Sequence, residues 1–197
     1  MITMKNIIRE GHKSLVQVAK EVKLPLSKHD FQLGLDLLEY IKNSQDDGIA
    51  QEHQLRPAVG LAAPQINVLK RMFAVHVTDF DGMLYSFILI NPKIVKTSKS
   101  LIYLPGGEGC LSVDRITEGI TPRYEWVEFE AHSLDVPSGL VVPITLKVEG
   151  YVGIVFQHEF DHLNGILYTT KLFPELPNAK PAFEFETACA SLENQPD

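Results

Sequence analysis

The first clear pattern along the chain is an amphipathic segment near its start. Its apolar residues recur at helical spacing, at Phe31, Leu35, Leu38 and Ile41. The residues from Ser27 to Asp30 resemble a helix N-cap followed by an acidic residue, which is close to a capping box. Together they predict a helix over residues 28–44. A shorter helix is expected near residues 15–22, and the polar stretch 43–57 is expected to be a surface loop.

Alternating, β-rich segments predict strands in the middle of the chain. The expected strands are residues 72–78, 84–90, 93–97, 126–132 and 140–148, with turn-forming residues between them. Pro143 indicates that the last strand lies at a sheet edge or contains a bulge. The proline-rich segment after Lys171 is expected to be irregular, with a short apolar patch at Phe183 and Phe185.

A second helix is predicted over residues 150–164, where an apolar run leads into the sequence QHEFDHLNG. His158 and His162 are four residues apart, so a helix places both imidazoles on one face, where they can hold one metal ion. Glu159 follows the first histidine and could reach a water in the open position of that ion. The Asn-Gly pair at the end is a helix-stop signal. This histidine spacing also occurs by chance, so an ordinary buried helix is the alternative.

Two other stretches have compositions typical of loops that approach a ligand. Small residues surround Gly60 in the stretch that ends at Gln65, whose amide could point inward or lie in solvent after a tight turn. Cys110 lies in a glycine-rich loop and could be a thiolate metal ligand, a nucleophile or an inert thiol. A two-histidine helix suits a metal site better than a nucleophile's base, and Cys/His/His leaves tetrahedral zinc or iron one open position.

Composition narrows the class of protein. A chain of 197 residues with 45% hydrophobic and 22% charged residues has a composition that is ordinary for a globular protein. We expect one catalytic domain over residues 1–197, in which residues 173–197 form a tail of uncertain structure. The net charge of −7 argues against binding of nucleic acid through phosphates. We expect neither a signal peptide nor a membrane helix. Cys110 and Cys189 are expected to stay reduced, Cys189 being incidental.

Taken together, three stretches resemble the signature motifs of the peptide deformylase family. They are GLAAPQ at 60–65, EGCLS at 108–112 and the QHEFDHLNG sequence, in the same order and in the same loop, loop and helix contexts. The similarity extends over roughly residues 6–172, and the VDR sequence after Ser112 resembles the longer subtype of Gram-positive bacteria. Two departures stand out. Ala58 occupies a position where the family often has glycine, and residues 117–121 lack the family's tyrosine.

The resemblance implies the metal and the base. Cys110, His158 and His162 would hold one divalent ion, natively ferrous iron, which nickel, cobalt or zinc can replace. Glu159 would be the general base and acid when a metal-bound water attacks the formyl carbon. The reaction would remove the formyl group from the N-terminal N-formylmethionine of new polypeptides and release formate.

The resemblance also implies the binding groups. Gln65 and the backbone N–H of Leu111 would bind the carbonyl oxygen. The peptide would lie as an added strand along the backbone of Val59, Gly60 and Gly109. The side chains of Ile154 and Val155, next to His158, would line the methionine pocket. Asp161 and a Glu108/Arg123 pair are candidates to orient the ligands.

The expected fold is α+β. Antiparallel strands from residues 72–97 and 126–148 would wrap around the 150–164 helix, with the 28–44 helix packed outside. The expected partners are formylmethionyl nascent peptides near the ribosome exit in the bacterial cytoplasm, with no nucleic acid and no membrane.

Two other classes compete with a deformylase. A metzincin protease would need a third histidine where Tyr168 stands, and a thermolysin-like protease would need Glu184 or Glu186 as a ligand and would leave the Cys110 loop unexplained. A metal-stabilised binding module would have its open coordination position blocked, and nothing in the sequence supports such a block.

Overall fold

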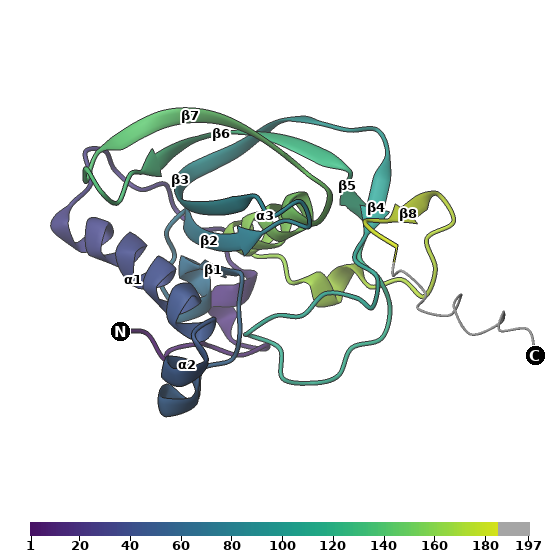
Figure 1. Ribbon diagram of the computed structural model, residues 1–197, viewed down its shortest axis with the longest axis horizontal. Coiled ribbons are helices and arrows are strands. Elements are labelled where there is room, and N and C mark those ends of the chain that lie inside the picture. The colour runs from purple at the N-terminus through teal and green to yellow at the C-terminus, as the bar shows by residue number, and fades with distance from the viewer. Residues whose placement is uncertain (185–197) are drawn as a thin grey trace, which may run out of the picture.

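The computed structural model describes residues 1–184 of the chain (Figure 1). Its helices are α1 (Lys28–Ser44), α2 (Asp47–His53) and α3 (Gly150–Leu163), with 3₁₀ turns at Lys13–Val16, Ala63–Ile66 and Tyr168–Lys171. Its strands are β1 (Gly60–Ala62), β2 (Met72–Thr78), β3 (Leu84–Thr97), β4 (Leu101–Tyr103), β5 (Arg123–Tyr124), β6 (Trp126–Leu134), β7 (Val141–Glu149) and β8 (Ala179–Pro181).

The main sheet is antiparallel and has the strand order β1-β2-β3-β6-β7. A small second sheet has the order β5-β4-β8, in which β8 pairs parallel with β4. Figure 1 shows the long strands β3, β6 and β7 curving over α3, which confirms the expected α+β architecture. Pro143 lies in β7, an edge strand, as its missing N–H predicts.

Two helices cover opposite faces of the sheet, and the alternation of β2 explains how. Met72 and Ala74 belong to the apolar cluster that contains the buried residues of α1, whereas Phe73 and Val75 belong to the cluster around α3. Successive side chains of a strand point to opposite faces, so β2 is buried on both. The N-terminal helix therefore packs outside the sheet that wraps α3, as expected.

The expectations for residues 15–22 and 43–57 were wrong. Only a 3₁₀ turn, Lys13–Val16, forms near the helix expected at 15–22. The stretch expected to be a loop contains α2, which begins where the Asp46 carboxylate accepts a hydrogen bond from the Ile49 N–H at 3.0 Å. In the first segment long-range backbone pairing replaces a helix, because the Ala19 N–H donates to the Leu163 carbonyl and the Lys20 N–H to the Leu69 carbonyl. In the second, the local Asp46 cap starts a helix.

The strands expected at 84–90 and 93–97 are one strand, β3, with a shift of register between Ile90 and Lys93. Asn91 lies at this register shift and has a left-handed backbone conformation, with φ of 53°. Its side-chain amide accepts a hydrogen bond from the Val22 N–H and donates one to the Val22 carbonyl, both at 2.8 Å. A long-range contact thus holds the strand together at the Asn-Pro pair.

The segment after Lys171 is more ordered than expected, because β8 pairs with β4 in the smaller sheet. Phe183 lies against Phe80, with ring centroids 4.6 Å apart. Phe185, Glu186 and Cys189 lie outside the described residues. Within residues 1–184, no helix is long and apolar enough to cross a membrane.

The start of α1 gives a prediction about acid stability. Ser27 caps the helix as expected, accepting from the Asp30 N–H at 3.1 Å, and the buried Asp30 carboxylate accepts hydrogen bonds from the Ser27 hydroxyl and the Lys70 ammonium. Burial would raise the pKa of Asp30, but these two donors lower it overall. We expect Asp30→Asn to reduce the free energy of unfolding by about 1–2 kcal/mol at pH 7.

The stabilisation by a carboxylate with a lowered pKa is present above its unfolded-state pKa and is lost as the pH falls through its folded-state pKa. The difference between wild type and Asp30→Asn should therefore shrink below about pH 4. Urea unfolding of both proteins from pH 7 to pH 3 measures this. Asp36→Asn, on the exposed side of the same helix, is the control, and a difference independent of pH would refute the assignment.

Candidate active site

Helix α3 carries three of the predicted site residues on its inner side. His158, Glu159 and His162 all lie in its last two turns, and Glu159 and His162 are buried. The helix ends at Leu163 with Asn164 as its C-cap, one residue before the expected end, and Gly165 follows with φ of 70°. A Cβ atom on Gly165 would lie 2.6 Å from the Val16 carbonyl carbon, so only glycine fits where the chain leaves α3.

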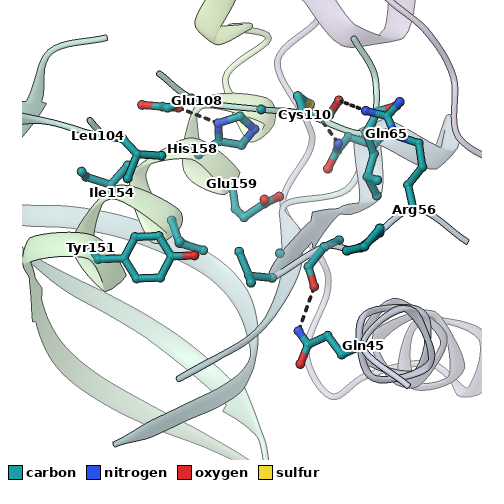
Figure 2. A pocket seen from close by; sticks show the side chains of 17 residues that line it. Gln45, Arg56, Gln65, Leu104, Glu108, Cys110, Tyr151, Ile154, His158 and Glu159 are labelled. Atoms are coloured by element: carbon teal, nitrogen blue, oxygen red, sulfur yellow. Dashed lines mark hydrogen bonds and ion pairs between the residues drawn. The ribbon is translucent and has the colours of Figure 1, made fainter. Parts of the chain in front are cut away.

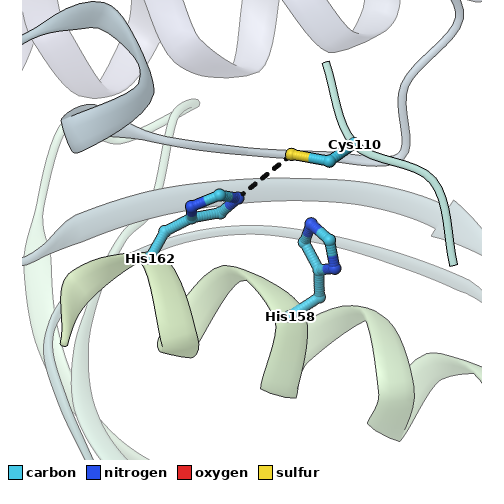
Figure 3. A group of neighbouring side chains, drawn as sticks. All are labelled: Cys110, His158 and His162. Carbon is cyan, nitrogen blue, oxygen red and sulfur yellow. Dashed lines mark hydrogen bonds between the residues drawn. The ribbon is translucent and has the colours of Figure 1, made fainter. Parts of the chain in front are cut away.

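Cys110 reaches this helix from the loop that follows β4. Its sulfur lies 3.4 Å from Nε2 of His162, and one donor atom from each of Cys110, His158 and His162 lies within 4.8 Å of the others (Figure 3). Figure 3 shows both imidazoles rising from α3 toward the sulfur. Three such side chains could hold one metal ion, and the set of one thiolate and two imidazoles suits zinc or iron.

The charges around Cys110 also fit a metal ligand. Burial would raise the pKa of its thiol, but the neighbouring imidazoles outweigh burial and hold that pKa well below its usual range. Burial would lower the pKa of His158, but hydrogen bonds to Cys110 and Glu108 raise it well above its usual value. The site therefore favours the thiolate, which is the form of cysteine that binds metals.

Glu159 points into the same space from α3. Within residues 1–184 its Oε2 atom is buried without a hydrogen-bond partner, and burial raises the pKa of the carboxyl to about 7 although both imidazoles oppose this. A Cβ atom on Gly60 would lie 2.4 Å from Oε1 of Glu159, so the glycine of β1 makes room for the carboxylate. A buried carboxylate of this kind is suited to exchange protons near neutral pH.

Gln65 points inward, so the alternative in which it lies in solvent is wrong. Its side chain is 1% exposed, its Oε1 accepts from the Ala62 N–H at 2.8 Å, and its Nε2 lies 3.4 Å from the Cys110 sulfur. Leu111 is the residue after Cys110, and within residues 1–184 its N–H donates to no acceptor. The Gln65 amide is therefore held beside the sulfur, and the Leu111 N–H stays without an acceptor at the residue that follows Cys110.

A buried ionic network supports the site from behind. Arg123 binds both carboxylate oxygens of Glu108 at 2.7 and 2.8 Å and one oxygen of Asp161 at 2.6 Å, so the predicted Glu108/Arg123 pair is confirmed. Glu108 also lies 2.8 Å from Nδ1 of His158, which turns the other ring nitrogen toward Cys110 (Figure 2). Burial would raise the pKa of Glu108, but Arg123 and His158 lower it to about 2.

A pocket of about 360 Å³ opens beside these groups. Its lining includes every position expected to bind substrate, namely Val59, Gly60, Gly109, Ile154 and Val155, together with Gln65, Cys110, Leu111, His158 and Glu159. Figure 2 shows Ile154 and Tyr151 on one wall and Arg56 and Gln65 across from them. The structure thus brings together all the predicted site residues. All of them except His162 line the pocket, and Nε2 of His162 lies at the Cys110 sulfur.

The pocket also contains residues that sequence reasoning missed, namely Gln45, Arg56, Leu104 and Tyr151. Of these, only Tyr151 had a signal, because it begins the apolar run before the histidines. Ala58, which stands where the family often has glycine, lines the pocket. Its carbonyl oxygen accepts a hydrogen bond from Nε2 of Gln45 at 2.8 Å. Residues 117–121, which lack the family's tyrosine, contribute no residue to the pocket lining. Glu184, the ligand that a thermolysin-like protease would need, is not part of the group formed by Cys110, His158 and His162.

Three side chains that could hold one metal ion, beside a buried carboxylate and a pocket, are typical of hydrolases that use a metal ion. The family model described as "Polypeptide deformylase" matches residues 4–177. The chain belongs to the polypeptide deformylase family, whose members are enzymes.

Individual relatives and solved structures are similar to this chain over most of its length. The chain is 51% identical over 181 residues to peptide deformylase 2 of Geobacillus stearothermophilus, covering 92% of this chain and 96% of that one, and 46% identical over the same length to peptide deformylase 2 of Bacillus subtilis, with the same coverage. Among solved structures, the peptide deformylase of Thermus thermophilus is similar with a TM-score of 0.62 and 30% identity, covering 85% of this chain and 84% of that one. A Met-Ala-Ser-bound class I type b peptide deformylase from Acinetobacter baumannii has a TM-score of 0.64 and 27% identity, covering 84% and 96%.

Proposed function

We propose that this protein removes the formyl group from the N-terminal formylmethionine of nascent polypeptides, with one divalent ion held by Cys110, His158 and His162. The observation that carries the proposal is the meeting of these donors with Glu159 at the inner end of the pocket. Ferrous iron is the proposed native ion, with nickel, cobalt or zinc as substitutes, since thiolate and imidazole ligands suit all of them. When bound, the ion would supply a Lewis acid and lower the pKa of a coordinated water.

The chain's own groups would perform the remaining steps. The carboxylate of Glu159 would take a proton from the attacking water and give it to the leaving amine, so that formate and a free N-terminus result. The amide of Gln65 and the N–H of Leu111 would donate hydrogen bonds to the formyl oxygen as negative charge develops on it. The Gln65 amide already lies at Cys110, and the Leu111 N–H has no competing acceptor within residues 1–184.

The pocket supports a methionine side chain and an extended peptide. Ile154 and Val155 give it an apolar wall. Gly60 begins β1, an end strand of the main sheet, and Val59 precedes it, so a peptide could add as a strand here. The Acinetobacter baumannii neighbour described as bound to Met-Ala-Ser agrees with a peptide that begins with methionine. The proposed workplace is the region where chains leave the ribosome in the bacterial cytoplasm, without nucleic acid or membrane as a partner.

Formate release from a formyl-Met-Ala-Ser peptide tests the proposal. The protein would be purified without oxygen, loaded with ferrous iron and assayed for metal content, with acetyl-Met-Ala-Ser as the control peptide. Rapid release from the formyl peptide alone is the expected result. A metal-loaded protein that releases no formate would refute the proposal and favour a metal-stabilised binding module.

The role of Gln65 predicts a measurable loss. Replacing it by leucine removes one of the two donors to the formyl oxygen, and the loss of one such donor typically lowers kcat by about a hundredfold or more. We expect Gln65→Leu to show this loss with unchanged metal content. Gln32→Leu, at a position on α1 away from the pocket, is the matched control, and wild-type turnover in Gln65→Leu would remove the residue from the mechanism.

A further inference from the structure

Arg56 occupies a position in the pocket that the motif residues do not explain. It lines the pocket from the segment before β1, and its Nη2 donates to the carbonyl oxygen of Cys110 at 3.3 Å. Its Nη1 lies 3.5 Å from the carbonyl oxygen of Leu111. Figure 2 shows its side chain beside Gln65 and Cys110. A cation therefore lies against the backbone of the Cys110 loop.

The Cys110 carbonyl and the Leu111 N–H belong to the same peptide unit. That unit is planar and trans, so its C=O and N–H point in opposite directions, and a group that fixes the oxygen also fixes the N–H. Arg56 and the Val113 N–H, at 3.2 Å, both bind this oxygen. Within residues 1–184 the Leu111 N–H has no acceptor, so it remains available at the pocket.

Arg56 is itself held in place by the loop that it contacts. Its Nη1 binds Oδ1 of Asp114 at 2.7 Å, and the other oxygen of Asp114 accepts from Nε of Arg9 at 2.8 Å. Asp114 lies four residues beyond Cys110, so the ion pair closes a short ring around the Cys110–Leu111 peptide. The guanidinium can satisfy Asp114 and the Cys110 carbonyl together because its donors form a rigid planar fork.

We propose that Arg56 is a positioning residue that orients and polarises the Cys110–Leu111 peptide so that the Leu111 N–H is aimed at the reacting carbonyl oxygen. The proposal rests on the function proposed above, because it needs an oxygen that gains charge during the reaction. A hydrogen bond to the carbonyl of a peptide also strengthens its N–H as a donor, because linked hydrogen bonds polarise one another. Arg56 would act through Leu111, and its effect would appear in kcat.

Arg56→Met tests this, because methionine keeps an unbranched chain and removes every donor. We expect kcat for formyl-Met-Ala-Ser to fall roughly 10- to 100-fold, part of the loss typical of a whole oxyanion donor, with KM changed less than about threefold and metal content unchanged. Arg56→Lys, which can still donate to the carbonyl, should recover part of kcat. In zinc-loaded protein labelled with ¹⁵N-leucine, the Leu111 amide resonance should shift in Arg56→Met.

Arg115→Met is the matched control. Arg115 lies in the same loop and forms an ion pair with Glu10 at 2.8 Å, but within residues 1–184 no hydrogen bond joins it to the Cys110 peptide. Its kcat and its Leu111 resonance should match wild type. If Arg56→Met does not fold, Asp114→Asn removes the anchor of Arg56 and should lower kcat in the same direction.

Three results would overturn the proposal. An unchanged kcat in a folded, metal-loaded Arg56→Met protein would show that the Leu111 N–H needs no support. A higher KM with unchanged kcat would show that Arg56 contacts the substrate directly. An unshifted Leu111 resonance would show that the peptide is not reoriented. A wild-type protein that releases no formate would instead refute the proposed function, and the resonance would still report on the positioning.

Discussion

Glu159→Gln is expected to lose nearly all deformylase activity while keeping its metal. The side chain keeps its shape, but an amide cannot take a proton from water or return it to the leaving amine, and a positioned acid–base group typically contributes about 10²- to 10⁴-fold. The carboxylate is buried and its Oε2 has no partner within residues 1–184, so its loss should not lower the melting temperature. Formate release, metal analysis and thermal unfolding measure the three effects.

Glu149→Gln provides the control for this prediction. Glu149 precedes the same helix, but its side chain is 68% exposed and its ion pair is with Lys147, so its replacement should leave turnover unchanged. Glu159→Ala should resemble Glu159→Gln. Activity within about tenfold of wild type in either Glu159 variant would mean that another group moves the proton.

Arg123→Met is expected to have the largest effect on stability. It leaves the Glu108 carboxylate buried without its arginine, while Asp161 keeps Lys171 at 2.9 Å, and breaking a buried ion pair in this way typically costs about 3–5 kcal/mol. For a chain of this size that corresponds to a melting temperature lower by roughly 6–20 °C. Since Glu108 orients His158, metal affinity should also fall about 10- to 100-fold.

A double-mutant cycle separates the pair from the rest of the network. Glu108→Gln removes the other charge, so the cost of Arg123→Met should be clearly smaller in that background. Arg115→Met removes an arginine whose side chain is 54% exposed, and it should cost at most about 1 kcal/mol. Equal costs of Arg123→Met with and without Glu108, in both stability and metal affinity, would show that the predicted pair does not act as a unit.

Local patterns predicted the parts of this structure that local forces decide. The helix over 28–44 and the helix that carries His158 and His162 follow from periodicity, a cap and a stop signal. The i, i+4 spacing predicted His158 and His162 as a pair. The glycine-rich loop left Cys110 open between metal ligand, nucleophile and inert thiol, and the resemblance to the peptide deformylase family implied it as the third donor. The chemical roles of these side chains remain proposals, which the variants above test.

Long-range contacts decided what could not be predicted. The continuity of β3 depends on Asn91 binding Val22, 69 residues away, and no local signal encodes that pairing. The place of Arg56 depends on Asp114, which is 58 positions further along the chain. Gln65 is held both by the nearby Ala62 N–H at 2.8 Å and by the distant Cys110 sulfur at 3.4 Å. The short helix α2 is different, since Asp46 is a local cap signal that the polar composition around it obscured.

The position of β1 at the end of the main sheet bears on how many different peptides the proposed site could accept. An edge strand pairs with a neighbour through main-chain N–H and C=O groups, which are the same in every polypeptide. A chain bound there would be held whatever its downstream side chains, and only the first one would meet a pocket. Such a site would sort chain ends from chain interiors without distinguishing one protein from another, so a single enzyme could serve every newly made chain in a cell.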